Sequence, residues 1–88
     1  MEILKYITGF WKRAMSPSGY YLIEEIISLT KCENGVYIVT RICQYPNRDD
    51  RPYDTETKIF NNYDTAFIWY ETYSNKLLKN MKSLNVVR

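Results

Sequence analysis

Few residues in this chain have the types and the spacing that catalysis requires. The 88 residues include no histidine, which excludes a Ser-His-Asp or Cys-His arrangement and every zinc site that needs an imidazole. The adjacent acids Glu24 and Glu25 lie in a predicted strand, where neighbouring side chains point to opposite faces. They therefore cannot act as a catalytic pair. We expect a protein that is not an enzyme and that binds no cofactor and no metal.

The two cysteines, Cys32 and Cys43, flank a turn at Glu33-Asn34-Gly35. An Asn-Gly pair between two β-rich segments predicts a hairpin, closed either by a two-residue turn or by a three-residue loop with Gly35 left-handed. In the first register the thiols lie roughly 20 Å apart at ~3.3 Å per residue, and in the second they lie on opposite faces. Neither register allows a disulfide. Two free thiols agree with a reducing compartment, so we expect a cytoplasmic protein.

The segment Pro46–Asp54 is longer than its connection requires. It joins two predicted strands, although a hairpin needs only about two to five residues. It combines acids with arginine and tyrosine, which are enriched at binding hot spots, and its acids lack the spacing of a calcium loop. The alternative is a solvated loop with internal salt bridges. The predicted partner-binding residues are Tyr45, Arg48, Asp49, Asp50, Arg51, Tyr53, Ile68 and Trp69, with Arg48, Arg51 and Tyr53 as anchors and Asp49 and Asp50 as specificity elements.

A basic C-terminal segment offers a second function. The chain has no acidic residue after Tyr73, so its cations could follow the phosphates of a nucleic acid. The residues of this alternative site are Lys76, Lys79, Lys82 and Arg88. Lysines near the C-terminal end of a helix are, however, commonly a solvated face. The net charge of only +2 and the missing aromatic signature of sheet-based RNA-binding modules favour a protein partner.

Two helices are predicted, one near each end of the chain. Apolar residues between Ile3 and Met15 recur at helical spacing, so we expect an amphipathic helix there, with Gly9 on its polar side and an end at Ser16-Pro17-Ser18-Gly19. Charges interrupt its apolar runs, so we expect neither a signal peptide nor a membrane span. The second helix starts at a cap, Asn62 or Asp64, and runs to about Ser83. Its apolar stripe comprises Ala66, Phe67, Tyr70, Tyr73, Leu77, Leu78, Met81 and Leu84.

Three strands are predicted between these helices. Tyr20–Cys32 and Val36–Tyr45 are rich in β-branched and aromatic residues, and Thr55–Phe60 forms a shorter strand at an edge. Alternation places Tyr21, Ile23, Ile27 and Leu29 on one face of the first strand and Leu22, Ile26, Ser28 and Thr30 on the other. Neither face is purely polar. Either both faces are partly covered, or one of them is a binding surface.

These elements predict a single α+β domain over residues 1–88, in the order α-β-β-β-α. A three-stranded antiparallel sheet with both helices packed on one face buries the two apolar stripes around one core. The chain is rich in residues with AT-rich codons and holds nine tyrosines, and this composition resembles that of small phage and mobile-element proteins. The resemblance implies a protein that inhibits or modulates a host or defence protein by occupying its surface. A homodimer is compatible with so small a core.

Overall fold

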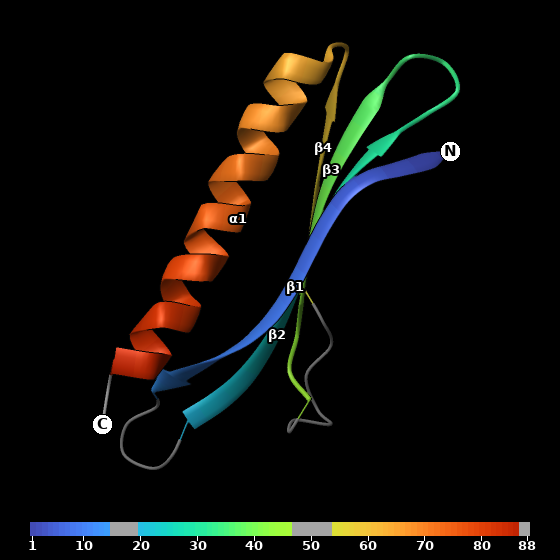
Figure 1. Cartoon of the computed structure of the whole chain (residues 1–88). Helices are drawn as coiled ribbons and strands as arrows, with labels where there is room; N and C mark the ends of the chain where they lie inside the picture. The colour runs from blue at the N-terminus through green and yellow to red at the C-terminus, as the bar shows by residue number, and fades with distance from the viewer. Residues whose placement is uncertain (15–19, 47–53, 87–88) are drawn as a thin grey trace.

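The chain forms one sheet and one helix. The computed structural model describes residues 1–14, 20–46 and 54–86, with side chains for residues 1–12, 22–46 and 54–81 (Figure 1). The elements are β1 (Glu2–Ala14), β2 (Tyr20–Lys31), β3 (Tyr37–Gln44), β4 (Asp54–Phe60) and α1 (Tyr63–Val86). The strands form one antiparallel sheet in the order β1-β2-β3-β4, and α1 packs along one face of it.

The predicted order α-β-β-β-α is therefore wrong at its N-terminal end. The structure has four strands and one helix, because the segment predicted as a helix from Ile3 to Met15 forms β1. Its apolar residues occupy both faces of the strand: Ile7 and Trp11 face α1, whereas Ile3 and Phe10 face away. Apolar residues on both faces hide the two-residue alternation of a strand and mimic the spacing of a helix.

Gly9 shows how β1 fits beneath α1. It is buried opposite Glu25 in the sheet and not, as predicted, on a polar surface. A Cβ atom at this position would lie 2.5 Å from Sδ of Met81 in α1. The missing side chain thus lets the last turns of α1 approach the sheet closely.

The β2–β3 hairpin and the edge strand confirm predictions. Of the two possible closures, the structure has the three-residue loop: Gly35 has a φ of 82° and Cys32 N donates to Val36 O at 2.8 Å. Cys32 and Cys43 are free thiols and lie on opposite faces. β4 lies at an edge, as predicted for Thr55–Phe60.

Helix α1 agrees with its prediction in position and cap. Asn62 Oδ1 accepts a hydrogen bond from Thr65 N at 2.9 Å, so Asn62 is the N-cap. Ala66, Tyr70 and Leu77 of the predicted stripe are buried, but Leu78 is exposed and the side chain of Leu84 lies outside the described residues. The core between helix and sheet consists of Ile27, Leu29, Val39, Ala66, Tyr70 and Leu77.

Candidate partner-binding surface

The sheet has one face that α1 covers and one face that no described helix or strand covers (Figure 1). We call the second one the open face. Alternation and register assign to it the even-numbered residues Tyr6–Lys12 of β1, Leu22–Thr30 of β2 and Ile38–Gln44 of β3, together with Ile3, Thr55, Thr57 and Ile59. It spans the whole width of the sheet.

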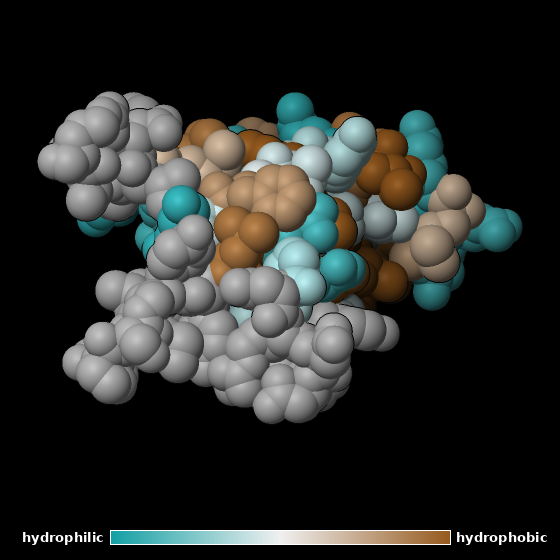
Figure 2. All heavy atoms as spheres, turned by 90° about the horizontal axis from the view of Figure 1, so that it is seen from below, coloured by the Kyte–Doolittle hydropathy of each residue, from teal (hydrophilic) through white to brown (hydrophobic). Residues whose placement is uncertain are grey.

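The open face carries many apolar side chains, whereas an exposed sheet face is normally polar. Two rows of paired residues across the strands carry most of this character. The first row is Ile3, Thr30, Ile38 and Ile59, and the second is Thr8, Ile26, Ile42 and Thr55. The most exposed large apolar side chains of this face are Ile3 (66% exposed), Tyr6 (67%), Phe10 (50%) and Ile59 (65%). Figure 2 shows, from one end of the molecule, hydrophobic groups reaching the surface between hydrophilic ones.

Hydroxyl groups and very few charges complete this surface. Between the two apolar rows lies a row of hydroxyl side chains: Tyr6, Ser28, Thr40 and Thr57. Among the described side chains of the open face only Lys12 and Glu24 are charged, and they sit diagonally across β1 and β2 near one end. A mixed aliphatic and hydroxyl face with so few charges can bury against another protein at low desolvation cost.

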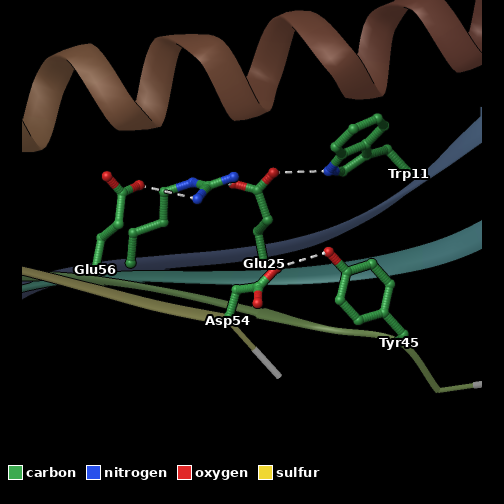
Figure 3. Close-up of polar contacts among 6 residues, drawn as sticks. Trp11, Glu25, Tyr45, Asp54 and Glu56 are labelled. Carbon is green, nitrogen blue, oxygen red and sulfur yellow. Dashed lines mark hydrogen bonds and ion pairs between the residues drawn. The ribbon is translucent and has the colours of Figure 1, made fainter. Parts of the chain in front are cut away.

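The face beneath α1 contains a chain of charged and aromatic side chains (Figure 3). Trp11 Nε1 donates to Oε2 of Glu25 at 2.8 Å, and Arg41 Nε donates to Oε1 of the same carboxylate at 3.2 Å. Arg41 Nη1 also donates to Glu56 Oε1 at 3.1 Å. Glu25 is only 3% exposed, and its neighbours across the strands are Gly9 and Cys43, whose small size leaves room for these donors.

This network links all four strands beneath α1 through hydrogen bonds between side chains. Both oxygens of Glu25 already accept hydrogen bonds from protein donors. Burial, the largest single influence, acts to lower the pKa of Arg41, but the charge of Glu25 and its hydrogen bond, together with Cys43 and Glu56, outweigh burial and raise the pKa. Arg41 therefore stays charged and holds the two carboxylates together.

Cys43 lies beside this network as a protonated thiol. Burial, followed by the charge of Glu25, raises the pKa of Cys43 to about 11. A nucleophilic cysteine needs a lowered pKa, so this sulfur is not activated at neutral pH. Burial and then the charge of Glu56 also raise the pKa of Tyr73, on the facing helix.

The predicted binding loop is only partly described. Residues Arg48, Asp49, Asp50, Arg51 and Tyr53 lie outside the described residues. The structure describes both ends of the loop. Tyr45 Oη donates to Asp54 Oδ2 at 3.1 Å and so links the end of β3 to the start of β4 (Figure 3).

Ile68 and Trp69 lie far from this link. Ile68 is 62% exposed on α1, while Trp69 stacks on Phe60 with ring centroids 6.4 Å apart and lies under Lys58 Nζ at 4.6 Å. Phe60 ends β4 and Asp54 begins it, a separation of about 20 Å along the strand. The structure therefore does not bring Trp69 together with Tyr45. Much of the indole surface packs within the protein.

The cations predicted for nucleic acid are half described. Lys76 and Lys79 are exposed on α1, one turn apart. The side chain of Lys82 and all of Arg88 lie outside the described residues. Within the part of the chain that the structure describes, no helix combines the length and the apolar character needed to span a membrane.

Sequence reasoning missed the β1 side of the open face. Tyr6 and Phe10 were placed on a helix, where they could not extend the apolar face of the hairpin. The signal that could have found them is the mixed character of both faces of β2, which required a second covering surface or a partner. Comparisons with protein-family models, with curated proteins and with solved structures give no match to this chain.

Proposed function

We propose that this protein is a non-enzymatic protein-binding module whose interface is the open face of the sheet. The observation that carries the proposal is that an apolar face four strands wide has no covering element among the described residues. Large exposed apolar patches on small domains mark interaction sites. An inhibitory or modulatory action toward another protein remains part of the same proposal.

The chemistry of the face defines what it can bind. Full burial of an aliphatic or aromatic side chain contributes about 1.5–3 kcal/mol, and several side chains here are half exposed or more. Hydroxyl groups between the apolar rows can exchange water for a partner's hydrogen bonds at little cost. The expected partner surface is apolar and flat, with few charges.

A matched pair of isoleucines tests which surface binds. Ile59 on the open face and Ile68 on the outer side of α1 are 65% and 62% exposed. We expect Ile59→Lys to abolish retention of protein partners by the tagged chain in affinity purification, because it places a charge inside an apolar interface. Ile68→Lys should retain the same proteins as wild type.

The retained proteins are then purified and tested for direct binding, with nuclease treatment to remove complexes bridged by nucleic acid. Direct binding that survives Ile59→Lys and is lost in Ile68→Lys would move the interface to the helix. Retention that disappears with nuclease for every variant would contradict the proposal and favour a nucleic-acid partner.

A further inference from the structure

We infer that the occupant of the open face is a second copy of this chain, packed sheet against sheet. This inference rests on the proposed function, because it names the partner of the same surface. In a two-fold dimer one patch must complement itself. The open face can meet this condition because its rows combine aliphatic and hydroxyl side chains, which pack against the same kinds of side chains in a second copy.

The charges of the face also favour a second copy. Its only two described charged side chains, Lys12 and Glu24, have opposite signs and lie near each other. The patch therefore has no net described charge that would repel an identical patch. Electrostatic steering of a different partner needs a face with net charge, and the described side chains of the open face provide none.

The area of the face is large enough for a specific interface. Its strands lie about 4.8 Å apart and rise about 3.3 Å per residue. β2 and β3 pair over eight residues, so the four strands cover roughly 500 Å² of flat area per copy. Two copies together then bury about 1,000 Å² or more, which reaches the lower bound of specific interfaces.

The dimensions of the single chain also favour a second copy on the open face. The Cα atoms span 48 × 29 × 16 Å with a radius of gyration of 14.9 Å, whereas a compact chain of this length has about 12 Å. The accessible surface is 6274 Å², against about 5,500 Å² for a compact monomer of this mass. The chain is thin because its sheet has a packed layer on one side only. A second sheet on the open face supplies the missing layer, with the two helices outermost.

Light scattering with size-exclusion chromatography on the purified full chain tests this inference. We expect wild type at micromolar concentration to have twice the 10.6 kDa of one chain. Ile59→Lys enters the interface twice and should raise the dimer dissociation constant about a hundredfold or more, which yields monomers. Ile68→Lys, which makes the same change outside the interface, should remain dimeric. Thr57→Lys, which adds a charge to the open face without removing an apolar group, should also weaken the dimer.

The outcomes separate the dimer from the proposed function. Circular dichroism of each variant verifies that the sheet and helix are retained. A wild-type mass of one chain at every concentration overturns the second copy. If Ile59→Lys then still abolishes direct binding of a different protein, the proposed function stands without the dimer. A dimer that Ile68→Lys dissociates and Ile59→Lys preserves overturns the inference for this face.

Discussion

At the scale of single residues, the structure depends on Glu25, a carboxylate that is almost fully buried between sheet and helix. It joins β1 to β3 by accepting hydrogen bonds from Trp11 and from Arg41. Glu56 binds the same guanidinium from the edge strand, but its side chain is 53% exposed. Two carboxylates that share one arginine thus differ mainly in burial.

This difference predicts unequal costs for the same isosteric change. Glu25→Gln removes the buried charge and makes the NH₂ group of the amide face either the Trp11 or the Arg41 donor, with which it cannot form a hydrogen bond. We therefore expect a loss of about 2 kcal/mol in the free energy of unfolding. Glu56→Gln should cost less than about 1 kcal/mol, because water screens an exposed pair. Urea denaturation measures the free energy of unfolding of both variants, and their m-values should equal that of wild type. Equal losses would show that burial does not set the strength of this network.

At the scale of elements, α1 is the only described helix, and its cap fixes where it starts. Asn62 Oδ1 satisfies the amide of Thr65 in the first turn. We expect Asn62→Ala to lower the free energy of unfolding by about 1 kcal/mol. Asn61→Ala, one residue earlier and also exposed, is the matched control and should change it by less than about 0.5 kcal/mol. Chemical denaturation followed at the helical circular dichroism band measures the free energy of unfolding of both variants. Equal losses would show that Asn62 does not stabilise the helix as its cap.

The elements differ in how well the sequence predicts them. The β2–β3 hairpin was predictable because Asn34-Gly35 favours a tight turn between strands, although it left two closures open, and α1 was predictable because its cap and stripe agree. β1 was not, because Ile3, Ile7 and Phe10 fit a helical stripe as well as two apolar strand faces. Only the pairing with β2 decides between the two, and that contact is not local in the sequence.

At the scale of the whole molecule, the error in β1 determined what could be predicted of the site. A helix over Ile3–Met15 would have left a three-stranded sheet, so its uncovered face could not be outlined from sequence. Alternation along β2 did predict that its second face, which includes Ile26, is either partly covered or a binding surface. In the structure Ile26 belongs to the open face. The loop residues predicted from composition alone have no such support from alternation or pairing.

If the open face forms the second core of a dimer, stability must depend on protein concentration. Folding is then coupled to association, and each tenfold increase in concentration favours the dimer by about 1.4 kcal/mol, which is about 0.7 kcal/mol per chain. For a domain of this size that shifts the midpoint of thermal unfolding upward by roughly 3–5 °C per tenfold increase. Ile59→Lys should unfold at a lower temperature that no longer depends on concentration, whereas Ile68→Lys should behave as wild type. Scanning calorimetry over a hundredfold range of concentration measures the slope. A wild-type midpoint independent of concentration would mean that each chain is stable with its open face in water.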